Sequence, residues 1–136
     1  DTRTAAQCGS SARLLEADLE NGPWPLMDKG EPAQFGAVVV TNYMWRPLMP
    51  NVLASLAPGG VLLYETFAAG NETVGRPRNP DFLLQPGELL ALCAGLHIVG
   101  YEHGYLDQPA RYVQRIAALR NFTPAYTGAA PVRHAL

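Results

Sequence analysis

Two short apolar runs separated by a helix-like segment constrain the fold of this chain more than any other feature. The first run, residues 35–40 (FGAVVV), ends in the cluster Thr41, Asn42 and Tyr43, and the second run covers residues 61–64. Both runs are continuously apolar, which is typical of parallel strands that are covered on both faces. Two such runs joined by a helix predict a βαβ unit.

The residues that follow these runs are the first place to look for function. In open parallel sheets, ligands bind beyond the carboxyl ends of the strands. Thr41, Asn42 and Tyr43 follow the first run, whereas Glu65, Thr66 and Phe67 follow the second. We therefore expect these side chains to gather at one edge of the sheet.

Composition indicates one globular domain within 136 residues, of which 48% are apolar and 16% charged. The net charge of -2 offers no electrostatic reason to bind nucleic acid or an anionic membrane, and no apolar run is long enough to span one. Cys8 and Cys93 lie far apart, which favours two reduced thiols in a cytoplasmic protein. The start at Asp1 and the lack of a clear element near it suggest a fragment or a processed product.

Turn and helix signals divide the rest of the chain. Pro47 and Pro50 bracket a helix start near residues 50–56, and Gly59 and Gly60 are expected to close that helix. Residues 68–82 have no apolar period, and a loop of that length is typical of an active-site lid or of a disordered segment. The other expected elements are a strand at 12–17, a helix that starts at 85–88 and a strand at 97–106.

Residues 110–120 fit a strand or a helix. The short turn at 107–109 favours a hairpin strand antiparallel to the preceding one. Residues 1–121 are then one domain, and residues 122–136, with Pro124, Gly128 and Pro131, form a C-terminal tail.

In these segments the chain resembles a class I S-adenosylmethionine-dependent methyltransferase, the seven-stranded Rossmann-like kind, and within it the small bacterial enzymes of the tellurite-resistance type. Residues 56–62 (LAPGGVL) match the LxPGG motif ahead of the fifth strand. Residues 35–43 (FGAVVVTNY) match the fourth strand and its exit, and residues 15–20 (LEADLE) resemble the end of the third. The expected hairpin fits the antiparallel sixth and seventh strands, so the resemblance covers residues 12–121.

The resemblance implies an α/β fold: a partial Rossmann-like sheet with the third to seventh strands in a three-layer αβα arrangement. The family's glycine-rich cofactor turn and its ribose-binding acid are not found in this sequence, and Gly59 and Gly60 cannot replace the turn because they open onto a strand. Without the first strand, the third and fourth strands would keep unpaired edges, through which copies of the chain could self-associate.

Four residues are the cofactor contacts that the resemblance implies. Asp18 would accept a hydrogen bond from the adenine amino group, with the Leu19 backbone N–H facing the ring, and Asn42 and Tyr43 would line the methyl-transfer position. An aromatic face favours a positive sulfonium. The structural alternatives are a surface acid at Asp18, a turn cap at Asn42 and a packed ring at Tyr43.

The candidate substrate contacts are Trp45, Arg46, Glu65 and Arg76. Arg76 and its neighbour Arg78 match an anionic substrate, although solvated loop arginines are more common. Trp45 and Arg46 could instead cover the sheet edge, and Glu65 could be a solvated acid. No metal site is expected, because His97, His103 and His134 are too scattered to hold zinc together.

The expected function is S-adenosylmethionine-dependent methyl transfer to an unidentified small molecule by direct displacement, with no catalytic group assigned. The alternative is a non-catalytic, truncated domain that needs a missing N-terminal segment or a partner chain to bind cofactor. A third reading, a nicotinamide dehydrogenase, requires a catalytic Tyr-Lys pair or His, and the only lysine is Lys29 in a loop.

Overall fold

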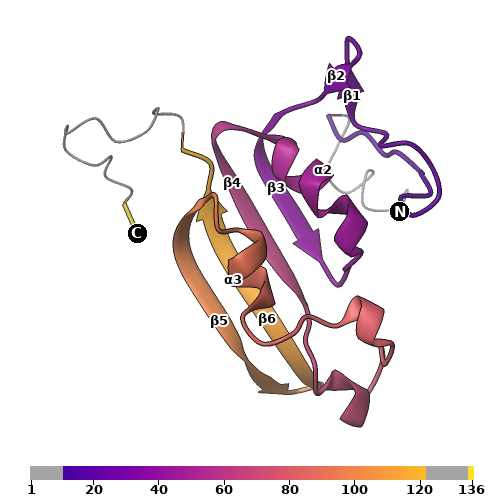
Figure 1. Ribbon diagram of the computed structural model, residues 1–136, viewed down its shortest axis with the longest axis vertical. Coiled ribbons are helices and arrows are strands. Elements are labelled where there is room, and N and C mark those ends of the chain that lie inside the picture. Colours follow the sequence, from indigo (N-terminus) through magenta and orange to yellow (C-terminus); the bar gives the residue numbers. More distant parts are fainter. Residues whose placement is uncertain (1–10, 122–134) are drawn as a thin grey trace.

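A four-stranded mixed sheet organises the structure, a computed structural model that describes residues 11–121 and 135–136 (Figure 1). Its strands lie in the order β3-β4-β6-β5. Their bounds are Phe35–Thr41 for β3, Leu56–Phe67 for β4, Ala110–Leu119 for β6 and His97–Asp107 for β5. The remaining elements are β1 (Met27–Asp28), β2 (Glu31–Pro32), η1 (Arg46–Leu48), α2 (Met49–Ala54), η2 (Asn71–Thr73), η3 (Pro80–Phe82) and α3 (Glu88–Leu92).

The predicted βαβ unit and the predicted hairpin are both confirmed. β3 and β4 pair in parallel, and η1 and α2 form the connection between them. β4 pairs antiparallel with β6, and β6 pairs antiparallel with β5 across the turn at 107–110. The last strand therefore lies between β4 and β5, which is the arrangement of a methyltransferase-like α/β fold.

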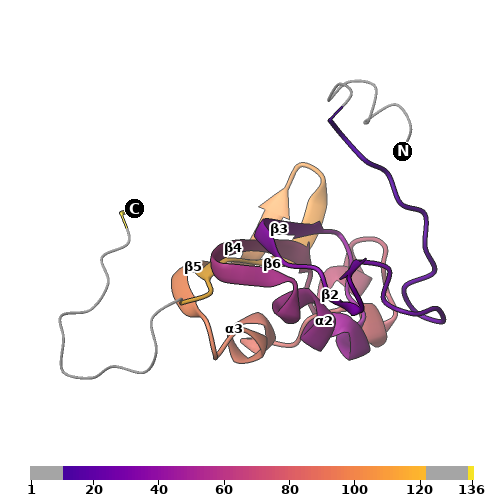
Figure 2. The same ribbon diagram turned by 90° about the horizontal axis from the view of Figure 1, so that it is seen from above.

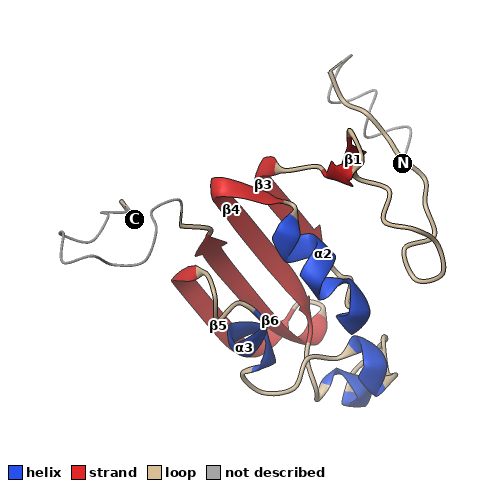
Figure 3. Ribbon diagram, turned by 45° about the horizontal axis from the view of Figure 1, so that its top comes forward, coloured by secondary structure: helices blue, strands red, loops and turns tan. Residues whose placement is uncertain are grey.

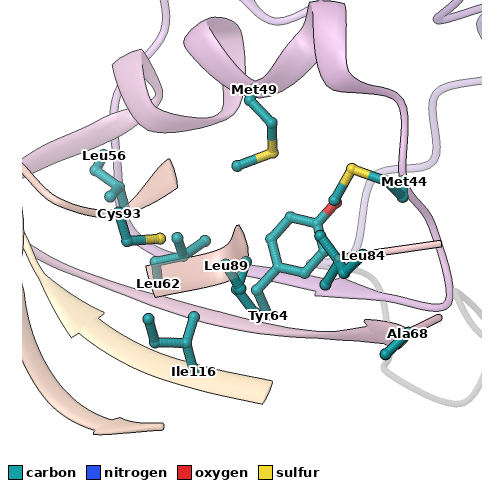
Figure 4. Packing of buried hydrophobic residues seen from close by; sticks show 10 residues of the cluster. All are labelled: Met44, Met49, Leu56, Leu62, Tyr64, Ala68, Leu84, Leu89, Cys93 and Ile116. Atoms are coloured by element: carbon teal, nitrogen blue, oxygen red, sulfur yellow. The ribbon is translucent and has the colours of Figure 1, made fainter. Parts of the chain in front are cut away.

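The core lies between the sheet and the helices on one of its faces. Figure 2 and Figure 3 show α2 and α3 on the same side of the sheet. Leu62 and Tyr64 of β4 point to this side and are buried, whereas Leu63 between them is 45% exposed. Figure 4 shows the cluster that fills this layer: Met44, Met49, Leu56, Leu62, Tyr64, Ala68, Leu84, Leu89, Cys93 and Ile116.

Two features of the expected fold differ from the described structure. Residues 12–17 form no strand but an exposed, irregular segment outside the sheet. Within residues 11–121 the helices cover one face only, so two layers are seen where three were expected. Residues 12–17 do not pair with the free edge of β3, and Leu14 and Leu15 within them are 45% and 51% exposed.

The sequence predicts that Pro58-Gly59-Gly60 closes the helix, and this prediction is wrong. α2 ends at Ala54, and the motif lies inside the first part of β4. Gly59 has a φ of 79°, and its N–H donates to the Arg120 carbonyl at 2.6 Å. A Cβ on Gly60 would come within 2.9 Å of the Phe35 carbonyl oxygen, so glycine there lets β3 and β4 approach closely.

Other expectations have simpler outcomes. The helix predicted to start at 85–88 is α3, and the strand predicted at 97–106 is β5. No helix among the described residues is long and apolar enough to cross a membrane. The predicted tail, residues 122–136, lies outside the described residues except for its last two positions.

Candidate functional site

A pocket of about 290 Å³ opens at the carboxyl ends of β3 and β4, where the parallel-strand rule places ligands. Its lining comes from both strand exits, from the 68–82 loop and from the segment before β1. The lining residues are Glu20, Asn42, Tyr43, Met44, Thr66, Phe67, Pro77 and Phe82. The structure thus brings the predicted pair Asn42 and Tyr43 into one cavity.

The exit of β3 is held in an unusual backbone conformation. Asn42 has a φ of 55°, in the left-handed region that asparagine tolerates better than most residues. Its N–H donates to the Glu65 carbonyl at 2.9 Å, which extends the β3–β4 ladder by one bond. The Tyr64 hydroxyl then donates to the Tyr43 carbonyl at 2.6 Å. These two hydrogen bonds hold the backbone of Asn42 and Tyr43 against β4, and Tyr43 lines the pocket from this position.

Among the described residues, the Tyr43 hydroxyl is the one buried side-chain polar group of the pocket lining that has no hydrogen-bond partner. Burial raises the pKa of Tyr43 above its ordinary value of 10.0, and the nearby carboxylates of Glu20 and Asp18 raise it further. The phenol therefore remains protonated at neutral pH and can donate a hydrogen bond.

The 68–82 loop, predicted to be a lid, is fastened by side chains from outside it. Arg46 Nε donates to Glu88 at 2.6 Å, and its two terminal nitrogens donate to the carbonyls of Asp81 and Leu83 at 2.8 and 2.7 Å. Asn71, 1% exposed, accepts from the Tyr112 N–H at 3.2 Å. The loop is thus an ordered wall of the pocket.

The hydrogen bonds of Arg46 give it a structural role that competes with its predicted substrate contact. Its guanidinium donates to the Glu88 carboxylate and to two carbonyls, and these bonds join the β3 exit to α3. The predicted Trp45 packs on Phe82 with ring centroids 6.4 Å apart, so it borders the pocket from behind a lining residue.

Four other predicted residues are not part of the pocket lining. The Asp18 carboxylate accepts from the backbone N–H groups of Glu20 and Asn21 and from the Asn21 side chain, which lowers its pKa, and Leu19 beside it is half-buried. Glu65 lies on the opposite face of the sheet, 3.6 Å from Arg115. Arg76 is exposed on the loop.

Strand alternation explains why Thr66, and not the predicted Glu65, reaches this pocket from β4. Side chains of consecutive strand residues point to opposite faces. Thr66 shares the helix-covered face with Tyr64 and reaches the pocket, whereas Glu65 cannot. Glu20 and Phe82 were not predicted because tertiary contacts alone bring them to the strand ends.

Neither metal nor thiol chemistry is indicated in the described part of the chain. No cluster of three or more His, Cys, Asp or Glu side chains occurs there. Cys93 is buried, and burial raises the pKa of its thiol to about 11, so it is an unreactive core residue. Cys8 lies outside the described residues.

Comparison with known proteins bears on the fold. No family model matches the chain, and no curated protein matches it. Among solved structures, TehB from Haemophilus influenzae superposes with a TM-score of 0.51 and 16% identity, over 65% of this chain and 36% of the TehB chain. This likeness concerns the fold, and the chain spans about a third of the TehB chain. Together with the strand order, it shows that the chain has a methyltransferase-like α/β fold.

Proposed function

We propose that this chain supplies the methyl-transfer side of an S-adenosylmethionine-dependent methyltransferase site that acts on a small molecule. The observation that supports it best is the buried, unpartnered Tyr43 hydroxyl in a pocket at the carboxyl ends of β3 and β4. A buried hydroxyl without a partner costs free energy, so its retention suits a group that a bound molecule will pair.

The pocket lining fits the reactive end of this cofactor. Tyr43, Phe67 and Phe82 bring aromatic rings to the cavity, and Glu20 adds a carboxylate. Aromatic faces and a negative charge both favour a sulfonium cation. The ribose end of the site has no counterpart here, because the sequence lacks the family's glycine-rich turn and ribose-binding acid.

The residues of the pocket can orient and shield the reactants. When bound, S-adenosylmethionine supplies an activated methyl group. Direct displacement needs alignment and exclusion of water more than proton transfer. Phe67 and Phe82 would exclude water, and the Tyr43 O–H would donate a hydrogen bond to the acceptor or to the cofactor. The loop wall held by Arg46 would fix Phe82 in place.

The alternative proposal is a non-catalytic domain that needs a further segment or a partner chain. It is favoured by the uncovered sheet face and by β3, which is an edge strand of the four-stranded sheet in the described residues. Titration of the 136-residue chain with S-adenosylmethionine by calorimetry separates the two. Heat at micromolar cofactor supports the first proposal, whereas no heat at high micromolar cofactor supports the alternative.

Replacement of Tyr43 by phenylalanine is expected to have two effects of opposite sign. Affinity for S-adenosylmethionine, or for the methyl acceptor in its presence, should fall about 5- to 10-fold because one hydrogen bond is lost. The free energy of unfolding of the unliganded chain should stay level or rise by up to about 1 kcal/mol, since an unpaired buried hydroxyl disappears. Calorimetry and urea unfolding measure the two quantities.

The matched control is Tyr105→Phe, at a tyrosine that is 48% exposed and is not part of the pocket lining. This variant should change neither quantity. If Tyr43→Phe destabilises the unliganded chain and leaves ligand affinity unchanged, the hydroxyl has a structural partner and its proposed role is wrong.

A further inference from the structure

The pocket at the ends of β3 and β4 carries negative charge without a balancing cation. Glu20 is the one charged side chain among its lining residues, and among the described residues no lysine, arginine or histidine lines it. Burial raises the pKa of Tyr43, and the charges of Glu20 and Asp18 raise it further, so both carboxylates act on the pocket hydroxyl. The interior of the pocket therefore favours a cation.

The Glu20 carboxylate is available to a ligand. It forms no ion pair and accepts no hydrogen bond within the part of the chain that the structure describes. Its own turn holds it in position, because the N–H groups of Glu20 and Asn21 donate to Asp18 Oδ1 at 3.1 and 3.2 Å. Asp18 is thus a positioning residue that presents Glu20 to the pocket.

The arginines that could receive an anionic substrate are not part of this lining. Arg46 is engaged with Glu88 and with two backbone carbonyls. Arg76 and Arg78 flank the lining residue Pro77, but both are exposed and neither lines the pocket. A carboxylate or phosphate ligand would therefore meet a like charge in the pocket, which disfavours its binding.

We propose that the methyl acceptor of this site is a small aliphatic amine, which binds as its ammonium ion with Glu20 as the counter-ion. This inference rests on the function proposed above. The ammonium ion would also meet the aromatic rings of Tyr43, Phe67 and Phe82, whose faces attract cations. A cavity of about 290 Å³ leaves room for only a small acceptor beside the reactive end of the cofactor.

The position of Glu20 also suits the proton that methylation of an amine releases. An ammonium nitrogen has no lone pair, so it first gives one proton to the Glu20 carboxylate, which is exposed and can pass the proton to water. The nitrogen lone pair then forms a bond to the methyl carbon. The bond from that carbon to sulfur breaks, and its electron pair stays on sulfur as a neutral thioether. The products are a methylated ammonium ion and one proton.

Three molecules of similar size and different charge test the preference for a cation. Dimethylethanolamine is an ammonium ion at neutral pH, isoamyl alcohol is uncharged and isovalerate is a carboxylate. Ligand-observed NMR titration of the 136-residue chain, without cofactor, should rank their affinities in that order. The amine should bind about fivefold more tightly than the alcohol. A site for anionic substrates would give the reverse order.

Two matched variants assign the preference to one carboxylate. Glu20→Gln keeps the shape of the side chain and removes its charge, so the amine and the alcohol should bind within about twofold of each other. The control is Glu16→Gln, at an exposed carboxylate of the same segment that does not line the pocket. It should keep the preference of the unchanged chain.

Asp18 supplies a test of positioning. Asp18→Ala removes the acceptor for the N–H groups of Glu20 and Asn21 and should lower the preference for the amine. Asp18→Asn keeps a side-chain oxygen and should restore much of it. Equal preference in Asp18→Ala and the unchanged chain would show that Glu20 needs no such support.

Calorimetry with S-adenosylmethionine keeps this inference apart from the proposed function. A chain that binds the cofactor but shows no preference for the amine overturns the amine acceptor and leaves the proposed function standing. A preference that Glu20→Gln abolishes, in a chain that does not bind the cofactor, supports the ammonium site and overturns the methyl-transfer function. A preference that survives Glu20→Gln, or no binding of any of the three molecules, also overturns the inference.

Discussion

Replacement of Gln114 by leucine is expected to lower the free energy of unfolding by about 2–4 kcal/mol. Gln114 is completely buried on β6, and its side chain makes three hydrogen bonds. Its Oε1 accepts from the Tyr101 hydroxyl at 2.9 Å and from the Leu89 N–H at 3.3 Å, and its Nε2 donates to the Gln85 carbonyl at 2.7 Å. Leucine has a volume similar to that of glutamine, so the substitution leaves no large cavity. The loss of stability therefore comes from the buried partners of Gln114 that are left without a hydrogen bond.

Urea unfolding followed by circular dichroism measures this loss. The control is Gln108→Leu, in the exposed turn between β5 and β6, which should change the free energy of unfolding by less than about 0.5 kcal/mol. Equal stability of Gln114→Leu and the unchanged chain would show that α3 does not depend on this side chain for its position over the sheet.

Replacement of Arg46 by methionine is expected to lower the free energy of unfolding by about 1–3 kcal/mol. Methionine keeps much of the apolar stem but removes bonds to Glu88 and to the carbonyls of Asp81 and Leu83. The side chain of Glu88 is only 18% exposed, so its carboxylate loses its partner in a place with little water. We do not expect a loss above about 3 kcal/mol, because the Arg46 side chain is 36% exposed and water screens its charge.

This loss should depend on pH in a direction that the ion pair determines. The hydrogen bond from Arg46 lowers the pKa of Glu88 below its ordinary value of 4.5 in the folded chain. The pair therefore stabilises the fold above about pH 4.5, and its contribution disappears as the pH falls through the lowered pKa. The difference in unfolding free energy between the unchanged chain and Arg46→Met should shrink over that acid range.

The matched control for Arg46→Met is Arg78→Met, at an exposed arginine within the loop. It should leave the unfolding free energy within about 0.5 kcal/mol at every pH. Hydrogen exchange should show faster exchange of residues 68–82 in Arg46→Met, because the clamp at Asp81 and Leu83 is lost. Unchanged exchange in this loop would contradict the conclusion that the hydrogen bonds from Arg46 hold residues 68–82 in place.

Local sequence patterns predicted the elements of the sheet well. The continuous apolar runs at β3 and β4 and the turn before β6 depend on neighbouring residues only, and all three strands form, although β4 begins at Leu56, ahead of the expected residue 61. Asn42 and Tyr43 were predicted because the carboxyl end of a parallel strand is a place that sequence can identify, and both line the pocket there. The strand at 12–17 was predicted from its own residues, and the family likeness covered only residues 15–20; the segment forms no strand in the described structure.

Sequence by itself determined that β3 and β4 form a parallel pair with polar residues at its exit, since hydrophobic runs and breakers act over a few residues. Only the tertiary structure decided that Thr66 reaches the pocket and Glu65 does not, because the face of a strand depends on where the helices pack. Only the tertiary structure joined Arg46 to Glu88, 42 positions apart, and aligned Leu63 with Ala117 across two strands. Contacts over such distances depend on the register of the whole sheet, which no local pattern contains.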